Sequence, residues 1–266
     1  MNYGFIGCGN MSGALIKGAL NAGLISPEDV YVVEKTPEMT GKKAAEYGAL
    51  ACADYEEIIG RSDVLFIGLK PDVFPGFFAD AAPIFRRISK PIVTLAAGVS
   101  LEKLETLLDG AELPLIRVMS NLNVAIGQGV TAITRNKAAG DELYAQIKAI
   151  FAGLGAVFEM DEKLFPVFTA LAGSGPAFAL LFIESMAKGA HRLGMGKKDA
   201  LEAAARVALG SAMNYLAGGG AHPWEMIDRV CSPGGTTIEG IYTLEKMGFP
   251  AAVAAAVEAA AVKAKG

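Results

Sequence analysis

Apolar and polar positions change their spacing repeatedly along the first 160 residues of the chain. Short runs that are almost continuously hydrophobic alternate with longer segments in which apolar residues recur every three or four positions. The short runs are typical of strands covered on both faces, and the longer segments are typical of amphipathic helices. The runs predicted as strands are Tyr3–Ile6, Val30–Val33, Val64–Leu69, Ile92–Leu95, Leu115–Met119, Val130–Thr134 and Ala156–Met160. Helical patterns between them include Met11–Ala22, Thr40–Tyr47 and Leu101–Leu108.

The strand pattern ends near Met160, and the remainder of the chain has only helical spacing. The predicted helices are Phe165–Leu171, Pro176–Leu193, Lys197–Ala217, Pro223–Val230, Thr237–Met247 and Pro250–Lys263. Strands that alternate with helices predict a doubly wound parallel sheet, and a run of helices alone predicts a second domain. We therefore expect an α/β domain over residues 1–160, followed by an all-helical domain over residues 161–266.

Composition narrows the classes of protein to which the chain can belong. Hydrophobic residues make up 52 % and charged residues 20 % of the sequence, which suits a buried core. The net charge of −4 disfavours a nucleic-acid partner. The three cysteines Cys8, Cys52 and Cys231 lie far apart, so no metal site is predicted. No charge-free apolar run reaches about 18 residues, and no targeting segment is recognised. We expect a cytoplasmic protein without a membrane partner.

A glycine-rich turn connects the first predicted strand to the first predicted helix. Gly7 permits a tight turn, and Gly9 leaves room for a pyrophosphate to approach the backbone. Ser12 stands where a third small residue allows helix and strand to pack closely. The N–H groups that open the helix can then bind phosphate. The pattern predicts a Rossmann-type dinucleotide site, whose candidate ligands here are Ile6, Gly7, Gly9, Asn10 and Met11.

The end of the second strand bears on the choice of cofactor. Glu34 can accept hydrogen bonds from a ribose 2′-hydroxyl, which favours NADH. Lys35 and Thr36, together with Lys42 or Lys43, can instead hold a 2′-phosphate, which favours NADPH. The sequence leaves both cofactors open.

Two further strand ends carry candidate cofactor-binding residues. Leu69, Lys70 and Pro71 follow the third strand, and Ala96 and Ala97 follow the fourth. An open α/β sheet binds its ligands at the carboxyl ends of its strands. Small residues at positions 96–98 would allow a nicotinamide ring to lie against the backbone.

Several longer motifs, taken in order, resemble the pyrroline-5-carboxylate reductase family nearly from one end of the chain to the other. The segments that carry the resemblance are 4–11, Lys70-Pro71, 96–99, 173–178 and 230–239. The last of these contains Ser232-Pro233-Gly234-Gly235-Thr236-Thr237, which is far more specific than a glycine-rich turn.

The resemblance implies an enzyme that passes a hydride from NAD(P)H to a small cyclic imino acid and forms L-proline, the last step of proline biosynthesis. It implies a homodimer interlocked through the helical domain, and larger rings such as a decamer. It also implies that each active site lies between one subunit's Rossmann domain and helices of the partner. The residues that would hold the substrate carboxylate are Ser232, Gly234, Gly235, Thr236 and Thr237.

The residues of this loop suit such a role. Gly234 and Gly235 at a helix N-terminus expose N–H groups that can bind a carboxylate. Thr236 and Thr237 add hydroxyl groups, and Thr237 is the candidate catalytic residue that hydrogen-bonds the imine nitrogen, directly or through water. The alternative is a plain Pro-Gly-Gly turn with a threonine as helix cap.

One segment departs from the family pattern. The family usually has Pro-Asn-Thr-Pro where this chain has Ser120-Asn121-Leu122-Asn123. Asn121 is retained and remains a candidate cofactor-binding residue. The departure leaves two alternatives open, a reductase for a different ring and a non-catalytic dinucleotide-binding regulator. A β-hydroxyacid dehydrogenase is disfavoured because Lys188 is followed one turn later by Arg192 and not by asparagine.

Overall fold

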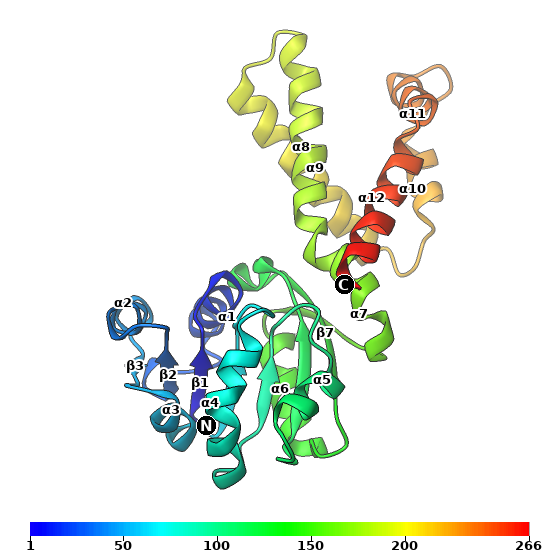
Figure 1. Cartoon of the computed structure of the whole chain (residues 1–266). Helices are drawn as coiled ribbons and strands as arrows, with labels where there is room; N and C mark the ends of the chain where they lie inside the picture. Colours follow the sequence, from blue (N-terminus) through cyan, green and yellow to red (C-terminus); the bar gives the residue numbers. More distant parts are fainter. Residues whose placement is uncertain (266) are drawn as a thin grey trace. The chain divides into compact units, whose positions relative to one another are not determined.

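The computed structural model describes residues 1–265, which fold into two compact units (Figure 1). One unit spans Met1–Gly173 and includes the end of the last helix from Ala260 onward. The other spans Ser174–Ala259. The α/β architecture and the helical C-terminal half that the sequence predicts are confirmed. The functional boundary between residues 160 and 161 stays a prediction.

An eight-stranded sheet forms the centre of the first unit, in the order β3-β2-β1-β4-β5-β6-β7-β8. Its strands are β1 (Tyr3–Ile6), β2 (Val30–Val33), β3 (Leu50–Ala51), β4 (Val64–Ile67), β5 (Ile92–Thr94), β6 (Leu115–Met119), β7 (Gly129–Arg135) and β8 (Gly155–Glu159). Strand order reverses beside β1, because β2 lies on one side of it and β4 on the other. The carboxyl ends at this reversal are the expected place for a ligand.

One pair of neighbouring strands breaks the predicted parallel arrangement. β7 runs antiparallel to β6, with Val118 opposite Ile133. Only segment 120–128, which contains the 3₁₀-helix Leu122–Ile126, connects them. A parallel crossover needs about a dozen residues or more, so this shorter connection favours the antiparallel pairing. Strand β3 was also not predicted, because a strand of two residues is too short to show a periodic pattern in the sequence.

The helices of this unit begin and end at local signals. They are α1 (Asn10–Asn21), α2 (Pro37–Tyr47), α3 (Tyr55–Arg61), α4 (Phe74–Arg87), α5 (Leu101–Leu107) and α6 (Asp141–Ala152), with a short 3₁₀-helix at Pro27–Asp29. Side chains of Thr36, Asp54 and Ser100 cap α2, α3 and α5 by accepting a hydrogen bond from a backbone N–H three residues on. Gly48 ends α2 with a φ of 66°.

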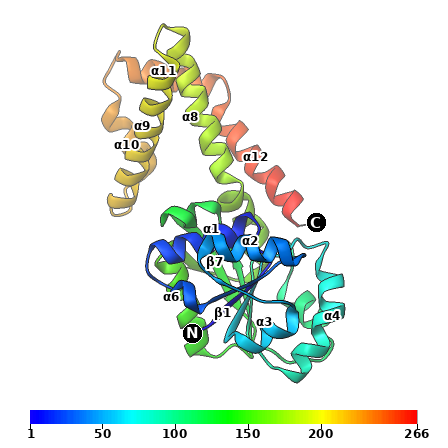
Figure 2. The same ribbon diagram turned by 90° about the vertical axis from the view of Figure 1, so that its left-hand side faces the viewer.

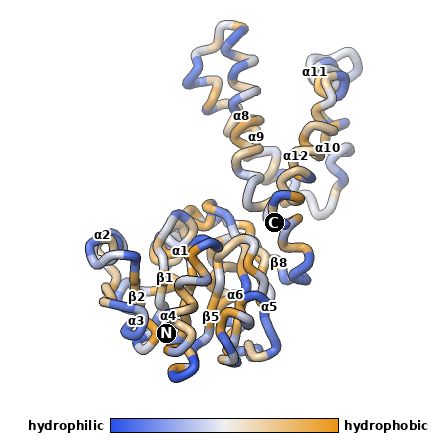
Figure 3. The backbone as a smooth tube through the Cα atoms, viewed as in Figure 1, coloured by the Kyte–Doolittle hydropathy of each residue, from blue (hydrophilic) through white to orange (hydrophobic). Residues whose placement is uncertain are grey.

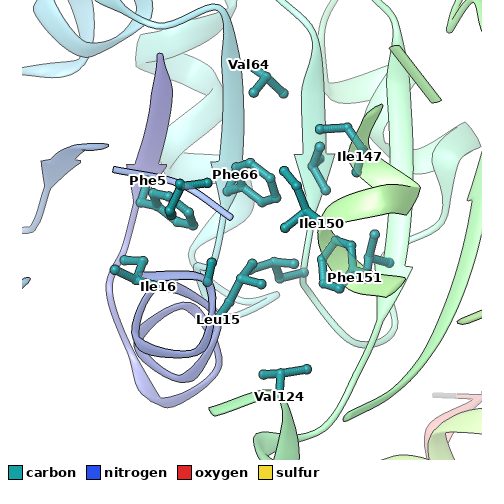
Figure 4. Packing of buried hydrophobic residues seen from close by; sticks show 14 of the residues in the cluster. Phe5, Leu15, Ile16, Val64, Phe66, Val124, Ile147, Ile150 and Phe151 are labelled. Atoms are coloured by element: carbon teal, nitrogen blue, oxygen red, sulfur yellow. The ribbon is translucent and has the colours of Figure 1, made fainter. Parts of the chain in front are cut away.

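Alternate residues of the strands build two separate cores, one on each face of the sheet. Phe5 and Phe66 pack on one face with α1 and α6, and their rings stack with centroids 4.8 Å apart (Figure 4). Ile6 and Ile67 point to the other face and join apolar side chains of α3, α4 and α5. These buried faces explain why the strands read as continuous hydrophobic runs.

A series of short helices follows the last strand, β8. These are the 3₁₀-helix Glu162–Leu164, α7 (Phe165–Phe168) and a π-helix over Thr169–Gly173. Phe165 and Phe168 pack against Ala132 of β7. Together with the helix that follows, the stretch Glu162–Arg192 is long and apolar enough to cross a membrane by length and composition alone.

The second unit consists of helices. They are α8 (Gly175–Arg192), α9 (Lys197–Ala217), α10 (Pro223–Val230), α11 (Thr236–Lys246) and α12 (Phe249–Ala264), the last of which extends beyond the unit. α8 and α9 lie side by side as a hairpin (Figure 2) and share a small core of Ala187, Ala200 and Ala204. Hydrophobic residues occur along all of these helices (Figure 3), yet many of their side chains are exposed.

Candidate functional site

A cleft of about 1340 Å³ opens in the α/β unit where the carboxyl ends of β1, β2 and β4 meet. Pockets for drug-sized ligands measure roughly 300–1,000 Å³, so this cleft is large enough for a larger ligand such as a dinucleotide. The predicted cofactor residues that line it are Ile6, Gly7, Gly9, Asn10, Glu34, Lys35, Leu69 and Lys70. Strand topology thus brings together residues from three separate parts of the sequence.

The glycine-rich turn at the base of the cleft has the shape that a phosphate needs. Gly7 has a φ of +81°, and a Cβ there would lie 2.7 Å from Leu69. A Cβ built on Gly9 meets no atom within 4 Å, so it would extend into open space. Gly9 is the N-cap of α1 and provides no side-chain hydrogen bond to the helix. The first N–H groups of α1 are therefore available to a phosphate, and the turn fits a dinucleotide.

Close packing behind the turn depends on a residue that sequence reasoning missed. A Cβ on Gly68 would lie 1.8 Å from Ser12 Oγ and 2.7 Å from the Gly7 carbonyl oxygen. Gly68 therefore allows β4 to approach the start of α1. The Ser12 hydroxyl is buried and has no hydrogen-bond partner within residues 1–265. The glycine at the end of an apolar strand was the available signal.

The carboxylate of Glu34 is tied to the glycine-rich turn. Cys8 N–H donates to Glu34 Oε1 at 2.5 Å, and Glu34 N–H donates to Thr40 Oγ1 at 2.9 Å. Burial, assisted by the charge of Glu34, raises the pKa of the Cys8 thiol to about 12. The thiol is therefore neutral at physiological pH, and Cys8 contributes its backbone rather than a nucleophile.

A charged cluster borders the cleft between α1 and α2. Glu46 accepts from Lys17 at 2.7 Å and from Lys43 at 2.8 Å, and Lys43 also approaches the Tyr47 hydroxyl at 3.3 Å. Hydrogen bonds from Lys17 and Lys43 lower the pKa of Glu46 to about 2. The hydrogen bond to Glu46 raises the pKa of Lys43. Of this cluster, sequence reasoning singled out Lys43 alone.

Other predicted cofactor residues lie outside the lining of this cleft. Met11 is half-buried against the core, and Pro71 is exposed on the loop after β4. Ala96 is buried after β5, where its N–H donates to Thr94 Oγ1 at 3.3 Å. Ala97 is exposed beside it. Their part in binding remains a prediction.

The segment that departs from the family pattern forms an ordered turn. Asn121 is buried, caps the 3₁₀-helix Leu122–Ile126, and donates through Nδ2 to the Ala172 carbonyl at 2.9 Å. Ser120 Oγ lies 2.8 Å from Thr131 Oγ1. Leu122 is half exposed and lines the cleft. The asparagine therefore connects this turn to the π-helix, a conformation that is frequent at functional sites.

A partly buried ion pair supports the same region. Arg117 on β6 lies 2.7 Å from Glu162, and its guanidinium stacks 4.6 Å above the ring of Phe165. The same Glu162 oxygen accepts from Leu101 N–H at 2.8 Å. This pair joins β6, the start of α5 and the segment that leads into α7, a link that the sequence pattern did not reveal.

The predicted substrate loop lies in the helical unit, between α10 and α11. Gly234 has a φ of 68°, and Gly235 donates its N–H to the Ser232 carbonyl at 3.0 Å. Gly235 is the N-cap of α11 and supplies no side chain, so neither Thr236 nor Thr237 caps the helix. The first N–H groups of α11 lie beside the half-buried Thr237, an arrangement suited to a carboxylate.

Residues 1–265 contain no group of three or more His, Cys, Asp or Glu side chains that could hold a metal ion. His222 is the N-cap of α10, where its Nδ1 accepts from Trp224 N–H at 3.2 Å.

Comparison with family models covers both halves of the chain. The model described as pyrroline-5-carboxylate reductase dimerisation matches residues 162–266. The model described as NADP oxidoreductase, coenzyme F420-dependent, matches residues 2–98. The second match covers all the residues that line the cleft except Leu122 and Ala125.

Individual proteins match the chain over all or nearly all of its length. Pyrroline-5-carboxylate reductase of Aquifex aeolicus is 35 % identical over 268 residues and covers 100 % of this chain and 97 % of its own. The Escherichia coli reductase is 34 % identical and covers 94 % of this chain and 92 % of its own. A crystal structure of the Streptococcus pyogenes enzyme has a TM-score of 0.87 at 36 % identity, covering 100 % and 98 %. The Plasmodium falciparum enzyme, solved with NADP bound, has a TM-score of 0.89 at 28 % identity, covering 100 % and 97 %.

Proposed function

Because the chain belongs to the pyrroline-5-carboxylate reductase family, we propose that it reduces pyrroline-5-carboxylate to L-proline with NADH or NADPH. The observation that carries this proposal is that the relationship extends over both halves of the chain. The segments that form the cofactor cleft and the loop over residues 232–237 are therefore both similar to segments of the same reductases. The chain is an NAD(P)H-dependent oxidoreductase of proline biosynthesis.

The α/β unit would hold the cofactor through its backbone. The pyrophosphate would lie over Gly9 and accept hydrogen bonds from the first N–H groups of α1. Glu34 and Lys35 border the position expected for the adenosine ribose. When bound, the reduced nicotinamide supplies the hydride that is added to the imine carbon. Asn121, Ala96 and Ala97 remain the proposed residues for the nicotinamide end.

The loop before α11 would hold the substrate. The first N–H groups of α11 would bind the carboxylate, because Gly234 and Gly235 leave the backbone before the helix open to it, with the hydroxyls of Ser232 and Thr236 beside them. A protonated imine is already electrophilic, so the protein needs to orient it rather than supply a strong acid. Thr237 would accept a hydrogen bond from the imine N–H, directly or through water. The hydride then forms a C–H bond, and the C=N electron pair becomes the amine lone pair.

The assembly that we propose is a homodimer, with a decamer as the larger ring. The helices of the second unit and their C-terminal caps carry large apolar side chains that stay in contact with solvent, including Leu193, Leu216 and Met247 at 91, 80 and 79 % exposure. Apolar surface of this extent is typical of a protein interface. In this assembly the cofactor unit of one copy works with the loop 232–237 of the other. We propose cytoplasmic location, no membrane and no nucleic acid as partner.

The experiment that tests the function follows absorbance at 340 nm while pyrroline-5-carboxylate is added to the protein with NADH or NADPH. We expect rapid, imine-dependent oxidation that is slower with the six-membered ring. Faster turnover of the six-membered ring would assign a different substrate. Binding of cofactor without any imine-dependent oxidation would instead support a non-catalytic regulator.

The variant Gly9→Val tests the proposed cofactor site. A Cβ at Gly9 meets no protein atom, so this variant should fold normally. Its isopropyl group would extend into the space proposed for the pyrophosphate, so cofactor binding should be lost. Wild-type NAD(P)H affinity in the folded variant would remove Gly9 from the site.

A further inference from the structure

Glu34 is held in place at both ends. Its backbone N–H donates to Thr40 Oγ1 at 2.9 Å, and Thr40 Oγ1 in turn donates to the Thr36 carbonyl at 3.1 Å. Its carboxylate accepts the N–H of Cys8 through Oε1 at 2.5 Å. A hydrogen bond between a charged oxygen and a backbone N–H is among the stronger kinds in proteins. The side chain is therefore fixed against the glycine-rich turn.

The position of this carboxylate determines what it can accept. It follows β2 directly and lines the cleft, where an open α/β sheet places the adenosine ribose of a dinucleotide. With Oε1 bound to Cys8, Oε2 remains available to a ribose hydroxyl. A 2′-phosphate at the same position would bring its negative charge against a carboxylate. Glu34 cannot turn away without losing its bond to Cys8.

The lysines around the cleft offset only part of the negative charge of the Glu34 carboxylate. Lys17 and Lys43 both bind Glu46, which neutralises part of their charge. Lys35 is exposed and forms no ion pair with any of the described residues 1–265. A flexible exposed lysine gains little from pairing with an anion, because water and side-chain entropy oppose it. The fixed carboxylate should therefore decide which cofactor binds.

We propose that Glu34 makes this enzyme selective for NADH over NADPH, by accepting the ribose 2′-hydroxyl and repelling a 2′-phosphate. This assignment rests on the proposed function for its reaction, but the selection acts on cofactor binding and needs no imine. Glu34 is thus a specificity-determining residue of the cofactor site.

Fluorescence titration of NADH and NADPH, without substrate, measures both dissociation constants directly. We expect NADH to bind the wild-type protein at least about tenfold more tightly, since a like charge within a few ångströms costs that much or more. Equal affinities, or tighter binding of NADPH, would overturn the proposal.

Glu34→Gln separates charge from position, because the amide oxygen can still accept the Cys8 N–H. We expect the ratio of the two dissociation constants to fall toward one, mainly through tighter NADPH binding. The ratio is measured within each variant, so a general loss of folding does not change it. Glu38→Gln, which removes an exposed carboxylate on the first turn of α2, should leave the ratio unchanged.

Two outcomes distinguish this proposal from the proposed function. Selective binding of NADH without turnover of any imine would uphold the role of Glu34 and contradict the reductase. Turnover of pyrroline-5-carboxylate with both cofactors at equal affinity would uphold the reductase and contradict the role of Glu34. A larger change of the ratio in Lys35→Gln than in Glu34→Gln would also overturn it.

Discussion

The two units of this molecule differ in how completely each buries its own apolar residues. In the α/β unit, β1 and β4 lie between two layers of helices, and Phe5 and Phe66 are at most 2 % exposed. In the helical unit, α8 and α9 bury little more than Ala187, Ala200 and Ala204. Both units are rich in hydrophobic residues, so composition does not cause the difference.

The difference indicates what each unit needs from a second chain. The α/β unit buries its apolar residues within its own core, and all the residues that line the cleft belong to this unit. The helical unit leaves an apolar stripe on α9, formed by Leu209, Met213 and Leu216, which are all at least 60 % exposed. These positions recur with helical spacing and lie on one face. Burying such a stripe against a partner is favourable.

The largest effect on stability should come from breaking the core of the α/β unit. Phe66→Ala removes a ring that stacks on Phe5 in a fully packed site. We expect the free energy of unfolding to fall by about 3–5 kcal/mol, the usual cost of such a cavity. Urea unfolding of the variant measures it. A loss below about 1 kcal/mol would mean that this core is not tightly packed.

A charge placed on the apolar stripe of α9 tests whether the helical unit uses this stripe to bind a second copy. Leu209→Glu leaves the isolated helix intact but should weaken dimer association about 100-fold or more, because a carboxylate would have to be buried or displaced. Light scattering at several protein concentrations measures the dissociation. Leu50→Glu on the edge strand β3, where Leu50 is 39 % exposed, is the control and should remain dimeric. A fully dimeric Leu209→Glu protein would contradict the proposed interface.

A smaller effect is expected from the substrate loop of the helical unit. Thr237→Ala removes a hydrogen bond to a charged imine, so kcat should fall about 10- to 100-fold while the affinity for NAD(P)H stays the same. Steady-state kinetics and cofactor titration test the two parts. Thr243→Ala in the same helix removes a hydroxyl that donates to the Glu239 carbonyl, and it should retain wild-type turnover. Equal activity of both variants would exclude Thr237 from the reaction.

The smallest effect should be the pH dependence contributed by Glu46. Bonds from Lys17 and Lys43 lower its pKa from 4.5 to about 2 in the folded protein. A depressed folded pKa stabilises the fold above the unfolded value, and this stabilisation is lost as pH falls from about 4.5 toward 2. Glu46→Gln should therefore be slightly less stable than wild type at pH 7, with a difference that shrinks in acid and in salt. A difference that is unchanged at pH 2.5 would contradict this assignment.

Sequence reasoning predicted the features that depend on local pattern. The strand runs, the turn at Gly7 and Gly9, and the helices from Lys197 to Val230 follow from periodicity and from turn chemistry. It did not predict the antiparallel β7, the approach of Gly68 to Ser12, or the bond from Asn121 to the Ala172 carbonyl. Those features arise between residues that are distant in sequence, and a single sequence carries little record of such pairings.

The features of the candidate site also fall into those that the local sequence pattern predicts and those that depend on distant contacts. Glu34 and Lys35 follow directly after a strand, so their place at the cleft could be predicted. The bond from Cys8 N–H to Glu34 could not, because it depends on how the β1–α1 turn and the end of β2 meet. The charged cluster of Lys17, Lys43 and Glu46 lies on two helix faces that look like ordinary solvated surface in the sequence.

We propose that the cofactor unit of one copy works with the substrate loop of a second copy. Co-expression of Gly9→Val and Thr237→Ala chains tests it directly, because a mixed dimer then contains one site with both wild-type halves. Random pairing should restore activity to about a quarter of the sites, well above either variant alone. Activity no greater than the average of the two parents, in a preparation shown to contain mixed dimers, would contradict the shared site.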